Sequence, residues 1–227
     1  MKKITAILFI FILMLINTHI SYSQVCVEFN CPDNSWNQAE LDLGDLFFSN
    51  GQHCHAILCY CWKGELDERH VYLEGIWIEN KYCVQGSNLD DPFLWDQLLQ
   101  KLILHESSLD PDNNPEYLFV PPCTGPGPFY NIVYKEHKQS CWYWQEGIGI
   151  NSLTLKPCES TGMCITAYAV CWDYGNPPNA ILSRTYLPAL SSSQILCSGG
   201  ELSHSNSKFP NSNPDVHVSE CWVVCNH

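Results

Sequence analysis

Fourteen cysteines constrain this chain of 227 residues more than any other feature, and all of them lie after position 25. An even set of cysteines in an exported chain is typical of a disulfide framework, because disulfides persist outside the cytoplasm. Structural zinc would need paired short spacings such as two Cys-x2-Cys motifs, and the sequence has none. The cysteines therefore predict a disulfide-bonded fold that needs no cofactor.

The first 23 residues have the layout of a secretory signal peptide. Two lysines precede a mostly apolar run over 4–16, which is shorter than the roughly 20 residues that a membrane-spanning helix needs. Ser21 and Ser23 supply the small residues that signal peptidase accepts, so cleavage is expected before Gln24. The mature chain is predicted to be secreted, to the periplasm or the extracellular space, with no membrane span.

Acidic residues outnumber basic ones, 24 against 11. Loss of Lys2 and Lys3 with the signal peptide takes the net charge from -13 to -15. A surface of this sign repels nucleic acid and anionic membranes. An extracellular glycan or protein, or a cation, is compatible with it as a partner.

Two stretches repeat one cysteine spacing and indicate a duplicated β unit. Each copy has two cysteines seven positions apart, a tryptophan after the second, and a third cysteine further on: Cys54, Cys61, Trp62 and Cys83, then Cys164, Cys171, Trp172 and Cys197. The segments between the first two cysteines, HAILCY and ITAYAV, have strand composition. A first unit over 24–120 and a second over 121–227 are predicted. The fold class is mainly β, with disulfide-rich antiparallel sheets.

Strand geometry limits how these cysteines pair. Seven steps of about 3.3 Å place the first two cysteines of each copy roughly 23 Å apart, too far for one bridge. Equivalent positions in a duplicated unit keep equivalent neighbours, so Cys61 is predicted to pair with Cys83, and Cys171 with Cys197. Bridges between the two units are the alternative. Cys59 points to the same face as Cys61 and should find a separate partner.

One amphipathic helix is predicted over 91–107. Asp90 or Asp91 can cap it, Pro92 fits its first turn, and apolar residues recur at i, i+4. Further strands are expected over 71–78, 129–137, 140–145 and 216–225. The segment 199–214 is rich in Ser, Asn, Gly and Pro and is predicted to be a polar loop.

One candidate binding site follows the predicted helix. Asp110, Asp112, Asn114 and Glu116 offer oxygen donors at alternate positions of a turn, as calcium loops do. The bidentate acid at the twelfth position is missing, so a plain Asx turn is the alternative. Calcium is the only cofactor that the sequence suggests.

Aromatic and histidine pairs give two more candidates. Trp142 and Trp144 lie on one face of a predicted strand, where they could stack on sugar rings; burial in the core is the alternative. His53 and His55 share a face of another strand and form a weaker candidate for a metal site.

Catalytic motifs are missing from the sequence. His105-Glu106 lacks the second histidine of a zinc protease helix, and there is no nucleophile elbow or phosphate loop. The sequence therefore predicts a secreted, disulfide-stabilised binding or structural protein without enzymatic activity. A secreted hydrolase that uses acidic residues is the alternative, with no catalytic residue assigned.

Overall fold

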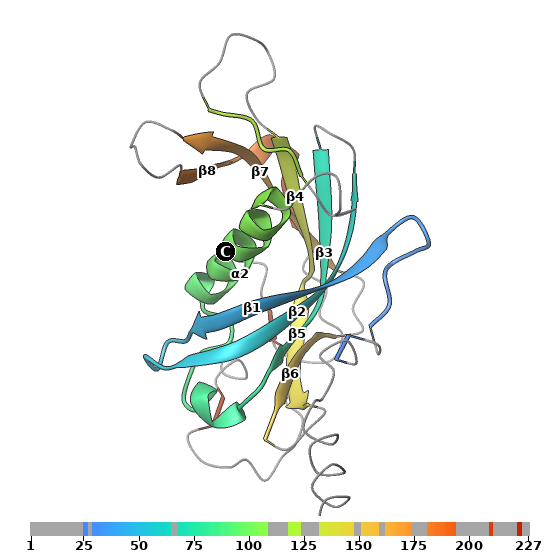
Figure 1. Cartoon of the computed structure of the whole chain (residues 1–227). Helices are drawn as coiled ribbons and strands as arrows, with labels where there is room; N and C mark the ends of the chain where they lie inside the picture. The colour runs from blue at the N-terminus through green and yellow to red at the C-terminus, as the bar shows by residue number, and fades with distance from the viewer. Residues whose placement is uncertain are drawn as a thin grey trace, which may run out of the picture.

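The computed structural model describes residues 25–26, 29–64, 68–108, 118–123, 132–147, 151–158, 162–173, 181–193, 209–210 and 222–223. Within these ranges the chain is mainly β, as predicted, with ten strands in one curled sheet and one α-helix (Figure 1). In chain order the elements are β1 (Asn37–Phe47), β2 (His53–Gly64), β3 (Glu68–Ile78), η2 (Lys81–Val84), α2 (Pro92–Ser108), β4 (Ile132–Gln139), β5 (Cys141–Glu146), β6 (Leu153–Pro157), β7 (Met163–Asp173), β8 (Ile181–Tyr186), η3 (Pro188–Leu190), β9 (Ser192–Ser193) and β10 (Trp222–Val223).

The sheet branches at β3. The antiparallel strands β1 and β2 lead to it, and its two halves then pair with different neighbours: residues 68–72 run parallel to β4, and residues 76–78 run antiparallel to β6. The β3–β4 pair departs from the predicted antiparallel pattern, because the connection through α2 returns the chain in the same direction. The units 24–120 and 121–227 both contribute strands to this sheet, and their common origin stays a prediction.

The helix predicted over 91–107 is α2. Asp91 caps it, since its Oδ1 accepts a hydrogen bond from the backbone N–H of Phe93 at 2.9 Å. The predicted apolar stripe is buried against the inner face of the sheet and consists of Leu94, Trp95, Leu98, Leu99, Leu102 and Ile103. No helix among the described residues is long and apolar enough to span a membrane.

The predicted strands over 71–78, 129–137 and 140–145 correspond to β3, β4 and β5 where the structure describes them. Of the strand predicted over 216–225, the described part is β10. β1 was not predicted, because its acidic residues and Gly44 disfavour a strand. Gly44 has a φ of +59° and lies where the β1–β2 register shifts, so it forms a bulge. In the predicted polar loop, Phe209 is buried and packs edge-on against Trp144.

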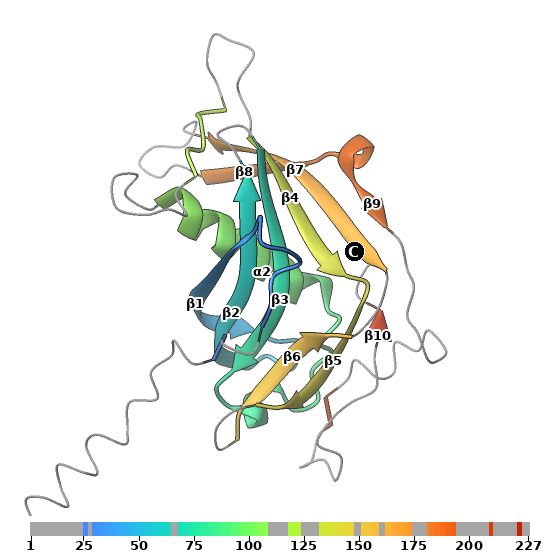
Figure 2. The same ribbon diagram turned by 90° about the vertical axis from the view of Figure 1, so that its right-hand side faces the viewer.

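Residues 29–36 cross the outer face of the sheet, opposite α2 (Figure 2). Disulfides Cys26–Cys59 and Cys31–Cys61 hold this segment on β2. Phe29 packs on β3 where Gly75 leaves room, because a Cβ at Gly75 would lie 2.2 Å from the Phe29 ring. These contacts form a second, smaller core on the outer face.

The disulfides correct the predicted pairing. Cys61 is bonded to Cys31 rather than Cys83, and Cys83 is bonded to Cys54. The β2–β3 register explains the difference: Cys61 lies opposite Tyr72, whereas Cys83 follows the far end of β3, which lies beside the start of β2. The returning strand therefore carries Cys83 away from Cys61 instead of toward it.

The second predicted pair is also wrong. Cys171 is bonded to Cys123, because residues 121–123 run alongside the end of β7, where the Cys123 N–H donates to the Trp172 carbonyl at 2.7 Å. Cys197, its predicted partner, lies outside the described residues. The separate partners expected for Cys59 and Cys61 are confirmed. Bridges of this number indicate that the chain folds in an oxidising compartment.

Candidate functional site

Ionisable and polar side chains line the outer face of β3 and β4. On β3 they recur at every second position, as Glu68, His70, Tyr72 and Glu74, and on β4 they are Lys135, His137 and Gln139. The parallel register sets His70 beside Lys135, and Tyr72 beside His137. One strand that precedes α2 in the chain and one that follows it thus bring seven such residues onto one surface.

Trp36 joins the two strands on this surface. Its ring packs edge-on against His137, His70 and Tyr72, with centroids 5.5, 6.5 and 6.1 Å away. The Lys63 ammonium lies 4.2 Å from the Trp36 ring centroid. We call Trp36, Glu68, His70, Lys135 and His137 the outer-face cluster; all five side chains are partly exposed.

A chain of hydrogen bonds links the members of the cluster. His70 Nε2 lies 2.7 Å from Glu68 Oε1, and His70 Nδ1 lies 2.8 Å from His137 Nε2. Lys135 also donates to Glu68 Oε1. With neutral rings, His70 donates to the carboxylate through Nε2, so its Nδ1 accepts the proton that His137 Nε2 donates. The carboxylate therefore fixes the tautomers of both imidazoles.

Electrostatics keep these rings neutral. Burial, together with the neighbouring His70, Lys63 and Lys135, lowers the pKa of His137 from its ordinary value to about 4. Burial also lowers the pKa of His70, although Glu68 opposes that shift. The hydrogen bond from Lys135 lowers the pKa of Glu68, which stays ionised. Neutral imidazoles beside one carboxylate can donate a hydrogen bond, accept one, or coordinate a metal ion.

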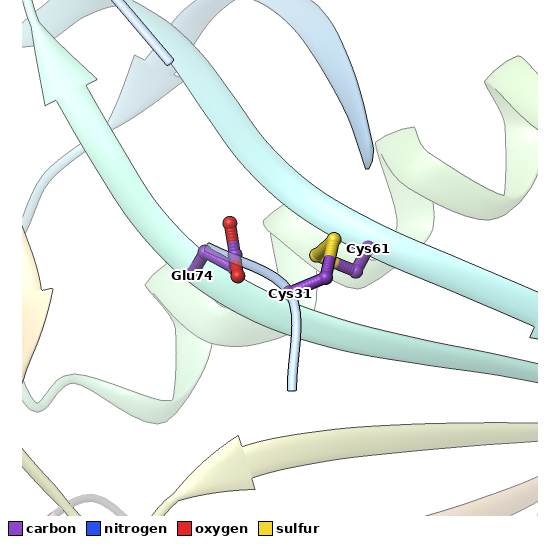
Figure 3. A group of neighbouring side chains, drawn as sticks. All are labelled: Cys31, Cys61 and Glu74. Atoms are coloured by element: carbon purple, nitrogen blue, oxygen red, sulfur yellow. A yellow bond between two sulfur atoms is a disulfide. The ribbon is translucent and has the colours of Figure 1, made fainter. Parts of the chain in front are cut away.

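Glu74 ends the row on β3 and lies beside the Cys31–Cys61 disulfide (Figure 3). It is the unpaired residue of a bulge, since Leu73 and Gly75 pair with adjacent residues of β2. Glu74 is 3% exposed, and its carboxylate has no hydrogen-bond partner among the described residues. Burial raises the pKa of Glu74 to about 7.

The two sulfurs and the Glu74 carboxylate lie within 4.8 Å of one another. The sulfurs are bonded to each other, so neither is a thiolate that could bind a metal ion.

A second polar group lies on the inner face and is structural. Arg69 Nε is 3.9 Å from Glu106 Oε2, both side chains are buried, and the guanidinium packs 4.3 Å from the Trp62 ring centroid. Burial raises the pKa of the nearby Tyr134 well above its ordinary value, and the charge of Glu106 adds to this shift. The group ties α2 to β3 and β4, away from solvent.

The predicted sugar-stacking pair is not exposed. Trp142 is 0% exposed and packs against Trp95, with ring centroids 4.9 Å apart. Trp144 is 4% exposed and contacts Phe209. The pair belongs to the core, which was the alternative reading of this run, because β5 turns that face inward. The calcium candidates Asp110, Asp112, Asn114 and Glu116 lie outside the described residues.

The histidine pair of β2 does not come together as a site. His53 is exposed and stacks on Phe47, with ring centroids 5.0 Å apart. His55 lies 3.0 Å from Asp42 and 3.6 Å from Glu79. Sequence reasoning missed the histidines at 70 and 137, although His137 ends one predicted strand and His70 directly precedes another.

Two cavities in the described part of the chain are small. One of about 230 Å³ lies beside Phe29 and Trp77, and another of about 170 Å³ lies beside Tyr186 and Ser192. Sites for small organic ligands usually enclose about 300 to 1,000 Å³. A partly exposed surface such as the outer-face cluster suits a ligand bound from one side.

Fold and bridges together define a cysteine-rich, mainly β protein built on one branched sheet. Comparisons of the chain with protein-family models, curated proteins and solved structures find no match.

Proposed function

We propose that the protein is a secreted, disulfide-stabilised, non-enzymatic binding protein that takes an extracellular glycan on the outer face of β3 and β4. The observation that carries this proposal is the packing of Trp36 against His70, Tyr72 and His137 on a partly exposed sheet face. Aromatic rings beside hydrogen-bonding groups suit sugars, which present both C–H faces and hydroxyls.

Charge supports the same surface. Lys135 pairs with Glu68 and Lys63 lies over Trp36, so two ammonium groups lie on this surface of a chain whose net charge is -13. The donors there can reach hydroxyl or carboxylate groups of a glycan, whereas the acidic remainder of the surface disfavours polyanions.

Export is part of the proposal, supported by the disulfides and by the signal-peptide pattern. Residues 1–24 lie outside the described residues. N-terminal sequencing of the exported protein should begin at Gln24, and retention of the apolar run over 4–16 would contradict export by cleavage.

The binding test compares two aromatic truncations on an array of extracellular glycans. Trp36→Ala should weaken binding by at least about tenfold, which corresponds to about 1.4 kcal/mol. Phe93→Ala is the matched control, because Phe93 is 59% exposed on α2, away from the cluster. Equal binding by wild type and Trp36→Ala, or no glycan bound by wild type, would contradict the proposal.

A secreted hydrolase that uses acidic residues is the second candidate, and one observation favours it. Glu74 has a pKa of about 7, which suits a general acid. It is 3% exposed beside a disulfide, so substrate would have to displace the N-terminal segment. Hydrolysis of a glycoside or ester panel that disappears in Glu74→Gln would favour this candidate over a binding protein.

A further inference from the structure

The strongest unassigned chemistry in the described part of the chain is the contact between two imidazoles. His70 Nδ1 and His137 Nε2 lie 2.8 Å apart, so two nitrogens that can each carry a lone pair point at one another. The third and fourth positions of a tetrahedral ion would have to be filled by water, because no third protein ligand joins this pair among the described residues.

We propose that the outer-face cluster binds a divalent transition-metal ion, with His70 Nδ1 and His137 Nε2 as its protein ligands. Zinc–nitrogen bonds of about 2.0 to 2.1 Å at a tetrahedral angle place two ligand nitrogens about 3.3 Å apart. The rings need to separate by only about half an ångström from their present contact to admit the ion. This inference rests on the proposal that the cluster is a binding surface.

Glu68 strengthens the assignment because of where it lies. It contacts His70 through Nε2, the nitrogen that faces away from His137. Metal-binding histidines usually donate their second N–H to a carboxylate, which fixes the tautomer and raises the basicity of the coordinating nitrogen. The structure holds His70 in that arrangement, with Nδ1 presented to the metal position.

Two lysines set a limit on affinity. Lys135 is paired with Glu68, and Lys63 lies over Trp36, so both place positive charge near the ion. With two protein ligands and this repulsion, binding should be in the micromolar range, far weaker than a structural zinc site. Removal of the Lys63 charge should therefore strengthen binding about two- to tenfold.

Calorimetric titration of the oxidised full-length protein with Zn²⁺ tests the inference. Wild type should bind one ion, His70→Ala and His137→Ala should lose it, and Glu68→Gln should weaken it about 10- to 100-fold. His53→Ala is the control, because His53 is an exposed histidine away from the cluster. Lys63→Gln should bind more tightly, an effect that a purely structural role of the cluster would not produce.

Long-range ¹H–¹⁵N spectra of wild-type imidazoles provide a readout that does not depend on variants folding. Zn²⁺ should shift Nδ1 of His70 and Nε2 of His137 while Nε2 of His70 keeps its proton. Zn²⁺ that leaves these nitrogens unchanged at millimolar concentration, or binding that survives both alanine variants, would overturn the inference. Wild type that binds no Zn²⁺ but keeps Trp36-dependent glycan binding would refute the metal site alone. Wild type that binds Zn²⁺ at these histidines but binds no glycan would refute the proposed function alone.

Discussion

Cys31 is bonded to Cys61 with their Cα atoms 5.7 Å apart, and the same N-terminal segment then brings Trp36 onto the histidines of β3 and β4. The bridge thus fixes the position of the outer-face cluster as well as adding stability. A second bridge, Cys26–Cys59, holds the same segment at a point that is further from Trp36 in the sequence. The two bridges can therefore be separated experimentally.

Removal of either bridge should cost similar stability, because the two close loops of similar length, with sequence separations of 30 and 33. Paired Cys→Ala variants should each lower the free energy of unfolding by about 3 to 4 kcal/mol in the chain-entropy model. Only the Cys31/Cys61 variant should also shift the indole N–H resonance of Trp36 in the NMR spectrum of the folded state, because it releases that side chain. Equal spectra for both variants would mean that the cluster holds Trp36 without the bridge.

Duplication makes a new prediction about Cys164. The bridge Cys54–Cys83 joins the first and third cysteines of copy one, so Cys164 should pair with Cys197 in copy two. Cys164 is disulfide-bonded and lies opposite Ser193 of β9, four residues before Cys197. Peptide mapping without reduction should recover this linked pair. A different partner for Cys164 would remove the main remaining support for a repeat.

Glu74→Gln should stabilise the protein at high pH. Burial raises the pKa of Glu74 from 4.5 to about 7, so the folded state favours its protonated form. That contribution to stability is complete below pH 4.5 and is lost as the pH rises through 7. Urea unfolding at pH 5 and pH 8 should show a gain of about 1 to 3 kcal/mol for the variant at the higher pH.

Glu79→Gln is the control for that experiment, because the Glu79 side chain is 57% exposed. It should change the pH dependence little. A wild-type protein whose stability does not fall between pH 5 and pH 8 relative to Glu74→Gln would contradict the burial of an uncompensated carboxyl group.

Two ion pairs of α2 should differ sharply in how much they contribute to the free energy of unfolding. Glu106→Ala removes the carboxylate paired with the buried Arg69 guanidinium, which should cost about 3 to 5 kcal/mol. Asp96→Ala removes a pair with Arg184 at 2.8 Å in which Asp96 is 54% exposed, and this should cost about 0 to 1 kcal/mol. Thermal or urea unfolding of both variants measures the difference, and similar losses would contradict the buried position of Glu106.

The sequence was sufficient for the parts of the fold that depend on local pattern. The capped, amphipathic helix and strands such as β3 and β4 follow from residues close together in the chain. The parallel pairing of His70 with Lys135 does not follow from local pattern, because it joins a strand that precedes α2 in the chain to one that follows it. No local pattern specifies such a pairing, so the outer-face cluster could not be predicted although its alternating residues are visible.

The disulfides show the same limit. Distance along a strand correctly excluded a bridge between the first two cysteines of each copy, since that argument needs only local geometry. The actual partner of Cys61 depends on the path of residues 29–31 over the sheet, which the sequence does not encode in any nearby motif. The sequence left two alternatives open for Trp142, sugar stacking or burial, for a related reason: which face of β5 is inward depends on α2 and Trp95.

Chemical-shift mapping tests the proposed binding surface most directly. A ¹⁵N-labelled sample is titrated with the glycan that wild type retains most tightly on the array. The largest shifts should fall on the Trp36 indole and on residues 68–74 and 133–139, with the cavity beside Tyr186 unaffected. Largest shifts beside Tyr186, or elsewhere away from β3 and β4, would contradict a binding site at the outer-face cluster.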